Sequence, residues 1–289
     1  MIDAHHHLWD LQAVHYPWLM DPAPRFFGDP APIRRNYLLP EFRADVETAG
    51  GHGSVHIQVG AEDGLAEAKW VQEVCDANPD WQMRQVVFCD LTQPDLEIVF
   101  DQFAKLPSVV GVRQIVGRSP EEDAATGTND LLENPAFVDG LKRAADRGWS
   151  FDLQLIPELM PAMARVIDQV PGLRVALCHA GSPYDRTDAG LAKWATLLQQ
   201  MSARENVVCK LSGLGMFDHG WTVEAFRPIV TEVLGQFGAK RVMFGSNFPV
   251  CSLTSDYATL IGAMRTLVPD ADHKDVFFQT AKGFYFSGQ

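Results

Sequence analysis

Short runs of β-forming residues alternate with stretches of helical spacing along almost the whole 289-residue chain. Eight such runs occur, at residues 1–5, 54–60, 85–91, 109–116, 150–156, 174–181, 206–212 and 241–248. Between them, apolar residues recur with helical periodicity at 65–78, 95–106, 135–147, 158–170, 191–204 and 223–237. This alternation predicts an α/β protein built of right-handed βαβ units around a parallel sheet. Eight units in about 250 residues are the size of a closed (β/α)8 TIM barrel.

The domain organisation follows from what interrupts this alternation. A doubly wound open sheet is the alternative, but no GxGxxG follows any of the runs. No linker or charge block divides the chain, so residues 1–289 are predicted to form a single domain. Residues 11–40, after the first strand, are rich in proline and aromatic residues, among them Trp18. This insertion is either a flap over the carboxyl end of the barrel or a connector packed across its bottom helices.

The composition excludes several classes of partner. The formal net charge is -13 at pH 7, whereas binding to nucleic acid or an anionic membrane needs clustered Lys and Arg. No run of about 18 apolar residues occurs, and no basic segment followed by an apolar one opens the chain. Five cysteines are scattered without a CxxC pair, as is typical of reduced thiols. We expect a cytoplasmic protein that acts on a small molecule, with homo-oligomerisation left open.

The chain begins with a histidine-rich stretch, DAHHHLWD at residues 3–10. Because side chains alternate along a strand, His5 and His7 would point to one face and His6 to the other. Two imidazoles at the end of a buried strand can hold a divalent metal, or can polarise a substrate oxygen without one. A tag remnant and a surface histidine cluster are the alternatives, but the flanking residues are apolar and acidic rather than linker-like. The stretch therefore favours an active site.

Polar residues recur at the predicted strand ends, where barrel enzymes place their chemistry. They are His5, His7, His56, Gln58, Arg113, Asp152, Gln154, His179, Lys210 and Asn247. Buried ionisable side chains are costly unless they are paired or used, so this recurrence is hard to explain by packing alone. Structural alternatives exist for several: an ion pair between Asp152 and Lys210, a pair between Arg113 and Asp90, and a core role for His56.

Six motifs in one order span nearly the whole chain: DAHHHLW, GVRQIV, SFDLQL, LCHAGSP, CKLSGLG and RVMFGSNFP. Together they resemble the amidohydrolase superfamily, and within it the TIM-barrel lactonases related to L-fuconolactonase and 2-pyrone-4,6-dicarboxylate lactonase. The resemblance implies that His5, His7 and His179 line the site and hold any divalent metal, although lactonases of this branch are thought not to require one. It also implies that Arg113 and Lys210 face the substrate.

The chain departs from the family pattern at Asn247, where the superfamily usually has an aspartate that deprotonates the attacking water. An amide cannot act as a base near neutral pH, and the replacement of a carboxylate by an amide removes a negative charge that would favour metal binding. The segment GLGMFDHGW after the seventh strand offers His219 as a replacement base, because an unperturbed histidine titrates near 6.5. The alternative is that residues 218–220 form a turn that caps the following helix.

These features predict hydrolysis of a small lactone of the sugar-acid or muconolactone type. His5 and His7 would polarise the ring carbonyl, and Asn247 would hold a water that His219 or His179 deprotonates. The predicted substrate contacts come from Arg113, Lys210, Gln58, Asp152 and Trp18. We expect no required cofactor, or a weakly bound zinc or manganese ion. The alternatives are a metal-dependent decarboxylase of the same superfamily and a non-catalytic sugar-acid binding protein.

Overall fold

Eight parallel strands form one sheet that curls into a barrel in the computed structural model, which describes residues 1–20 and 25–287. Each strand pairs with the next in chain order. The strands are β1 Ile2–His6, β2 Gly53–Ile57, β3 Gln82–Phe88, β4 Val109–Arg113, β5 Ser150–Leu153, β6 Arg174–Leu177, β7 Val207–Leu211 and β8 Val242–Phe244. The predicted TIM barrel is confirmed, and the open doubly wound sheet is excluded.

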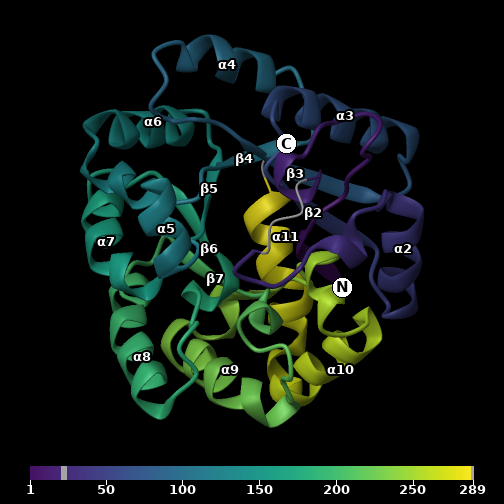
Figure 1. Ribbon diagram of the computed structural model, residues 1–289, viewed down its shortest axis with the longest axis vertical. Coiled ribbons are helices and arrows are strands. Elements are labelled where there is room, and N and C mark those ends of the chain that lie inside the picture. Colours follow the sequence, from purple (N-terminus) through teal and green to yellow (C-terminus); the bar gives the residue numbers. More distant parts are fainter. Residues whose placement is uncertain (21–24, 288–289) are drawn as a thin grey trace.

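Helices surround the barrel (Figure 1). They are α1 Pro17–Met20, α2 Leu39–Thr48, α3 Gly64–Ala77, α4 Leu96–Phe103, α5 Pro120–Thr126, α6 Pro135–Asp146, α7 Met160–Asp168, α8 Asp188–Ser202, α9 Val223–Phe237, α10 Tyr257–Leu267 and α11 Thr280–Tyr285. Polar side chains cap several of them; for example, Asp63 accepts two backbone N–H bonds at the start of α3. None of the described helices combines the length and the apolar character needed to cross a bilayer.

The barrel closes where the segment after β8 meets β1. The N–H of Asn247 donates to the carbonyl of His5 at 2.7 Å, and the N–H of His7 donates to the carbonyl of Phe248 at 2.7 Å. A Cβ atom at Gly245 would lie 2.5 Å from the Cβ of His5, so this approach requires glycine. The closure thus places the histidine-rich stretch beside Asn247.

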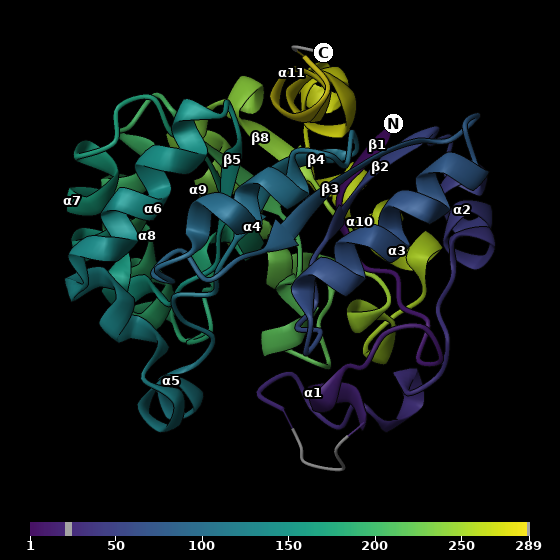
Figure 2. The same cartoon turned by 90° about the horizontal axis from the view of Figure 1, so that it is seen from above.

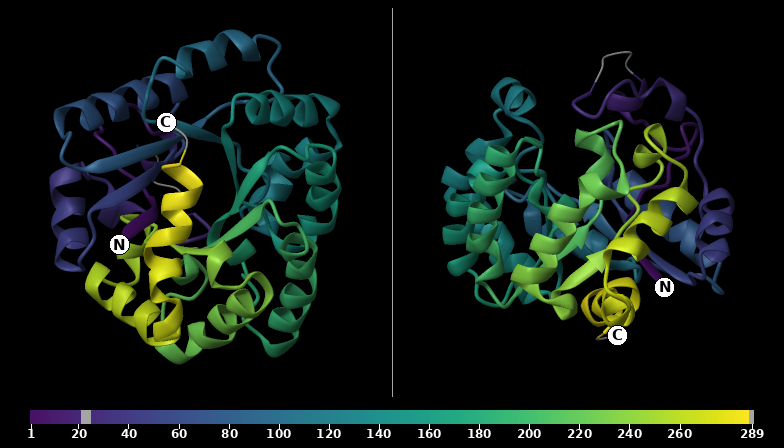
Figure 3. Two further views of the ribbon diagram at one scale, coloured as in Figure 1. Left: turned by 180° about the vertical axis from the view of Figure 1, so that it is seen from behind. Right: turned by 90° about the horizontal axis from the view of Figure 1, so that it is seen from below.

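The C-terminal helix α11 crosses the amino-terminal end of the barrel, opposite α1 and α5 (Figures 2 and 3). Its buried residues Phe284 and Tyr285 pack in one apolar cluster with strand residues that include Ile2, Val55 and Met243. These apolar side chains fill the barrel interior near its amino-terminal end. The carboxyl ends of the strands therefore remain as the end available for chemistry.

Several strands end earlier than the sequence predicted, for example β6 at residue 177 rather than 181 and β8 at 244 rather than 248. The residues that follow turn into left-handed conformations, with φ of 55° at His179 and 58° at Asn247. These residues are as buried as the strands themselves. Because burial continues beyond the hydrogen-bonded ladder, hydrophobicity did not mark the strand ends.

The described part of the insertion, residues 11–20 and 25–40, packs against loops at the carboxyl end of the barrel. The indole N–H of Trp18 donates to the carbonyl of Val59, just after β2. The ring of Phe26 stacks on Phe217, after β7, with centroids 5.6 Å apart. Pro22 and Pro24 lie outside the described residues. The insertion, which is the loop after β1, thus contacts the loops that follow β2 and β7.

Candidate active site

A pocket of about 380 Å³ opens at the carboxyl end of the barrel, a size suited to a small molecule. It is lined by five of the predicted site residues: His7, Trp18, Arg113, His179 and Asn247. Apolar side chains of the insertion and of loops, such as Phe26, Phe27 and Ile115, form much of its wall. The pocket thus combines a polar floor from the strand ends with apolar walls.

His7 is held in one tautomer. Its Nδ1 lies 2.7 Å from the carbonyl oxygen of Ile57, on β2. A carbonyl accepts only, so Nδ1 carries the proton. Burial and the charge of Arg113 lower the pKa of His7 to about 3. The ring is therefore neutral at physiological pH, with a lone pair on Nε2.

The lone pair of His7 Nε2 faces the side-chain amide of Asn247 at 3.1 Å. The neutral ring must accept here, so the matching partner is the NH2 group of the amide rather than its oxygen. With the amide in that orientation, its oxygen faces the Sγ atom of Cys251, which lies 3.4 Å from the other end of the amide. Burial raises the pKa of the Cys251 thiol to about 12, so its S–H is available to donate.

His179 follows β6 on a turn of left-handed backbone. His179, Ala180 and Ser182 have φ of 55°, 52° and 54°, conformations that non-glycine residues adopt at a cost. The turn places Nδ1 of His179 2.9 Å from Oγ of Ser212, at the end of β7, while its ring faces the pocket. A Cβ atom at Gly213 would lie 2.4 Å from Nδ1, so this contact also requires glycine. Burial, then the charge of Arg113, lowers the pKa of His179 well below its usual value.

The other two histidines of the opening stretch lie apart from the pocket surface. His5 is fully buried below it, with its ring centroid 4.6 Å from that of His179, and both of its ring nitrogens lack a partner among the described residues. His6 points out of the barrel and stacks on Phe42 of α2, with centroids 3.8 Å apart. His56 lies near His6, accepting the N–H of Leu8 at Nδ1.

Arg113, at the end of β4, is buried without an ion pair among the described residues. Its guanidinium donates to the carbonyl of Gln58 at 2.9 Å and to the side-chain oxygen of Gln154. Asp90, its predicted alternative partner, instead accepts from Thr92 and Gln114. Burial lowers the pKa of Arg113, as expected for a guanidinium that lacks a carboxylate partner.

Two arginines that line the pocket, Arg25 and Arg118, were not among the predicted site residues. Arg118 stands five positions after Arg113, beyond the end of β4. The sequence GVRQIVGR contains both Arg113 and Arg118. Its second arginine could therefore have been recognised as a candidate site residue. Nothing in the sequence near Arg25 marks it, because its position depends on how the insertion folds back.

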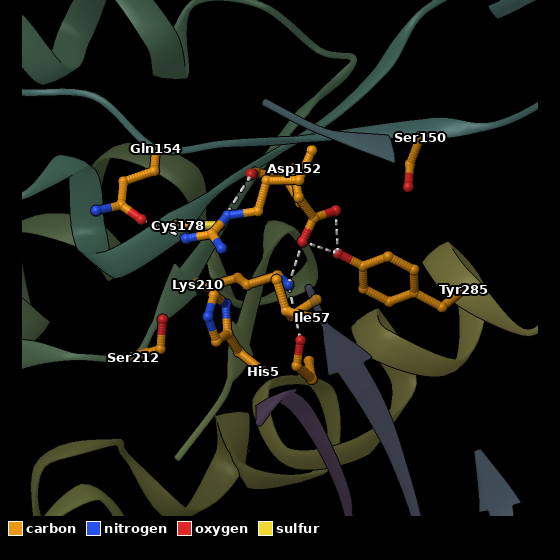
Figure 4. Close-up of polar contacts among 12 residues, drawn as sticks. His5, Ile57, Ser150, Asp152, Gln154, Cys178, Lys210, Ser212 and Tyr285 are labelled. Carbon is orange, nitrogen blue, oxygen red and sulfur yellow. Dashed lines mark hydrogen bonds and ion pairs between the residues drawn. The ribbon is translucent and has the colours of Figure 1, made fainter. Parts of the chain in front are cut away.

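Lys210 and Asp152 form an ion pair inside the barrel. Nζ of Lys210 lies 2.5 Å from a carboxylate oxygen of Asp152, and both side chains are fully buried. Tyr285 of α11 also donates to Asp152, at 2.8 Å, and Nζ of Lys210 donates to the carbonyl of Ala4 (Figure 4). Neither residue lines the pocket, and Gln58 turns its side-chain oxygen to the N–H of Gly60. The ion pair that the sequence offered as an alternative is thus present, and a role of Lys210, Asp152 and Gln58 in substrate binding stays a prediction.

His219 lies in a neighbouring groove and not beside His7, His179 and Asn247. The groove is also lined by Tyr184 and Phe217, and shares Arg25 with the pocket. The His219 ring packs against Gly28 of the insertion, where an added Cβ would lie 2.7 Å from Cε1. The helix that follows is capped by the Thr222 side chain, which accepts the N–H of Ala225. The structure thus separates His219 from the other predicted catalytic residues.

The donor groups fit a tightly held divalent metal poorly. The Nε2 lone pair of His7 is taken by Asn247. Burial, and then the nearby charges of Lys210 and Arg113, lower the pKa of His5, and the same two charges would repel a dication. Ligand atoms of His5, Asp152 and Cys178 lie within 4.8 Å of one another. However, Asp152 is already bound by Lys210 and by Tyr285. Weak binding of zinc or manganese remains a prediction.

Imidazoles, an amide and a guanidinium that meet at the carboxyl end of a (β/α)8 barrel define a site of the amidohydrolase type. The model of the Amidohydrolase family matches residues 2–286. The chain therefore belongs to this family, which confirms the resemblance that the motifs indicated.

Two curated relatives match most of the chain. The uncharacterized protein y4mH of Sinorhizobium fredii is 33% identical over 99% of this chain and 98% of its own length. An L-fucono-1,5-lactonase of Burkholderia multivorans is 28% identical over 89% of this chain and 84% of its own length. The similarity to these relatives extends over the whole barrel and is not confined to one motif.

Solved structures show the same fold. An amidohydrolase from Burkholderia multivorans with bound HEPES aligns with a TM-score of 0.81 at 24% identity, over 99% of this chain and 98% of that one. A second crystal form of that amidohydrolase, with bound zinc, aligns equally well, at 23% identity over the same shares. A putative 2-pyrone-4,6-dicarboxylic acid hydrolase from Pseudomonas putida aligns with a TM-score of 0.74 at 19% identity, over 100% of this chain and 98% of that one.

Proposed function

We propose that residues 1–289 form one catalytic domain that hydrolyses a small lactone by attack of water on the ring carbonyl. The observation that carries this proposal is the grouping of His179, Asn247 and Arg113 in one pocket, on elements far apart in the sequence. The relative named as an L-fucono-1,5-lactonase supports ester-bond hydrolysis as the reaction class. The described part of the insertion, through Trp18 and Phe27, covers the bound ring.

His179 is the general base in this mechanism. A base needs a free lone pair, which His179 has at Nε2 when Nδ1 carries the proton and donates it to Ser212 Oγ. The same Oγ accepts the backbone N–H of His179 at 3.2 Å, so one hydroxyl holds both the ring and its backbone. His219 is the less favoured candidate because it lies in the neighbouring groove.

Asn247 and Arg113 act on the other reacting groups. The amide of Asn247, fixed by His7, orients the attacking water without deprotonating it. Arg113 supplies positive charge to the pocket, where negative charge develops on the carbonyl oxygen. His179, protonated by the water, then returns the proton to the leaving alkoxide. The carbonyl carbon gains an oxygen from water, the ring C–O bond breaks, and a hydroxy acid results.

The alternatives differ in what they require. A decarboxylase of this superfamily would need a tightly held metal. In this chain, Nε2 of His7 is hydrogen-bonded to the Asn247 amide and is not free to bind one. A non-catalytic binding protein would share the pocket but release no acid. The fit of the donor groups thus favours metal-independent hydrolysis.

A pH-indicator assay with a panel of five- and six-membered lactones tests the proposal. We expect acid release that persists in the presence of a chelator and falls by about a hundredfold or more in His179→Asn, the usual contribution of general base catalysis. His273→Asn is the matched control, because His273 lies outside the pocket, in the segment after α10, where its Nε2 contacts the carbonyl of Val268. Saturable binding without any acid release from the panel would instead identify a binding protein.

A further inference from the structure

The groove that contains His219 adjoins the pocket and is larger than it. Its volume is about 750 Å³, compared with about 380 Å³ for the pocket. Arg25, Phe26 and Met216 line both, so the groove and the pocket meet at these side chains. A molecule whose reacting ring lies in the pocket therefore has room to extend into the groove.

The groove is built from the same loops that shape the pocket. α5 and the insertion project from the same end of the barrel (Figure 2), and the ion pair between Arg25 and Glu122 joins them. The loops after β6 and β7 contribute Tyr184, Phe217 and His219 to the lining. Loops at this end of a (β/α)8 barrel are where substrates bind. The position of the groove thus suits a part of the substrate.

One wall of the groove is an aromatic surface. The rings of Phe26 and Phe217 stack with an interplanar angle of 27°. Pro120 and Met216 add apolar atoms to the lining. Phe217 is only partly buried, so part of its surface is open to a ligand. Such a wall offers apolar contact to the flat face of a second ring.

Polar groups with free hydrogen-bonding capacity lie in the same groove. The side chains of Glu121 and His219 are exposed, and neither has a hydrogen bond or an ion pair with another described residue. The hydroxyl of Tyr184 donates to Glu158 at 3.0 Å and keeps its capacity to accept. A carboxylate accepts hydrogen bonds, and an imidazole N–H donates them. Together they match hydroxyl groups, which donate and accept.

The charges of the groove disfavour an anionic occupant. Its described lining contains two carboxylates, Glu121 and Glu122, and one guanidinium group, that of Arg25. Arg25 is paired with Glu122, whereas Glu121 has no cation within ion-pair distance among the described residues. The Glu121 carboxylate would repel a carboxylate or phosphate group of a ligand. A neutral ring with hydroxyl groups fits this lining.

From these observations we propose that the substrate is a lactone with a second, hydroxylated ring, which lies in the groove while the lactone ring lies in the pocket. The proposal rests on the proposed lactone hydrolysis and names the class of its substrate, a glycosylated aldonolactone. Water adds to the lactone carbonyl, the ring C–O bond of the ester breaks, and a water proton passes to the leaving oxygen. The glycosidic bond stays intact. His219 binds the second ring and takes no part in the proton transfer.

Three lactones that share one reacting ring test the proposal. They are glucono-1,5-lactone and its derivatives with glucose on O4 or on O6, cellobiono-1,5-lactone and gentiobiono-1,5-lactone. Acid release is followed with a pH indicator, after subtraction of spontaneous hydrolysis. We expect kcat/KM of at least one two-ring lactone to exceed that of the one-ring lactone by about tenfold or more, mainly through a lower KM, as two net hydrogen bonds would give. An equal or lower kcat/KM for both two-ring lactones would overturn the proposal.

A double variant assigns this preference to the groove. Glu121→Ala with His219→Ala removes two exposed polar groups of its lining. We expect it to abolish most of the preference, while kcat/KM of glucono-1,5-lactone changes by less than about threefold. Glu205→Ala with His15→Ala is the matched control, because both side chains are exposed and neither lines the pocket or the groove. A full preference in the groove variant would contradict the proposal.

A binding measurement separates failure of this proposal from failure of the proposed function. The open-chain products gluconate, cellobionate and gentiobionate are titrated calorimetrically into the wild type and the double variant. Binding of a two-ring product about tenfold or more tighter than that of gluconate, with the difference lost in the double variant, would support the second-ring site even if no lactone were hydrolysed. Turnover of one-ring lactones, with equal affinity for all three products, would support hydrolysis and contradict the second-ring site.

Discussion

Nε2 of His7 and the side-chain amide of Asn247 lie 3.1 Å apart at the seam where the end of β8 meets β1. The amide engages the lone pair of His7 Nε2 without adding negative charge, so the predicted metal ligands His5, His7 and His179 have no carboxylate beside them where the family pattern has an aspartate. The consequences of this one contact can be tested by restoring the carboxylate.

Asn247→Asp should increase zinc binding from substoichiometric to nearly one equivalent. A carboxylate adds the negative charge that three imidazoles lack. This charge offsets the repulsion of the metal ion by Lys210 and Arg113. Metal content after dialysis against zinc and then buffer is measured by mass spectrometry. Cys251→Ser, which keeps the amide, is the control and should not gain zinc. One tight equivalent in the wild type, with turnover lost on its removal, would contradict the metal-independent mechanism.

Ser212→Ala should lower kcat with little change in KM, because the hydroxyl positions the base and does not touch the substrate. Without Ser212 Oγ, the His179 ring loses the group that holds it at 2.9 Å. We expect a loss of about tenfold, smaller than the loss of about a hundredfold or more in His179→Asn. An unchanged kcat in folded Ser212→Ala, judged by circular dichroism, would show that the hydroxyl does not position the base.

His219→Asn should change kcat by less than about threefold, a small effect compared with the loss of a general base. The reason is its position in the neighbouring groove, against Gly28. Steady-state rates between pH 5 and 8 provide the measurement. A large loss of rate, together with a changed pH dependence of kcat, would transfer the role of base to His219.

Lys210→Met should destabilise the fold by about 3–5 kcal/mol, the cost of leaving a buried charge unpaired. The double variant Lys210→Met with Asp152→Asn should be more stable than the single one, because it removes both charges. Urea unfolding of the wild type, of Lys210→Met, of Asp152→Asn and of the double variant gives the coupling energy between the two side chains. If Lys210→Met kept full stability and only raised KM, the pair would be a substrate contact after all.

The free energy of unfolding should decrease as the pH falls below about 6.5. Burial lowers the pKa values of His5, His6, His7 and His179 in the folded protein. At pH values between these lowered pKa values and 6.5, the unfolded chain binds more protons than the folded one. Acid therefore favours unfolding, and the free energy of unfolding decreases by about 1.4 kcal/mol per pH unit for each histidine. The pKa of Asp3, raised to about 6 by burial, opposes this trend between pH 3.8 and 6.

Urea titrations at several pH values measure this slope. His6→Asn, outside the pocket, should reduce it by about one proton. A slope that is flat from pH 7 to 5 would contradict the buried neutral state of these histidines. His15→Asn, at an exposed position of the insertion, is the control.

The alternation of strand and helix was sufficient to predict the barrel, because each βα unit has a local pattern of apolar residues and helix punctuation. The same local pattern predicted that His5 and His7 share a face, since strand side chains alternate. Strand ends were less predictable. His179 and Asn247 stand in buried left-handed turns whose composition resembles that of the strands before them.

The sequence by itself determined the barrel and the set of polar residues near its carboxyl end. Tertiary structure alone decided how that set divides. Lys210 and Asp152 pair inside the barrel, His219 packs beneath the insertion, and Arg25 joins Arg118 at the pocket. These outcomes depend on how deeply each residue lies along its strand and on how a long insertion folds back. Such contacts join residues about 60 to 190 positions apart, and no local pattern specifies them.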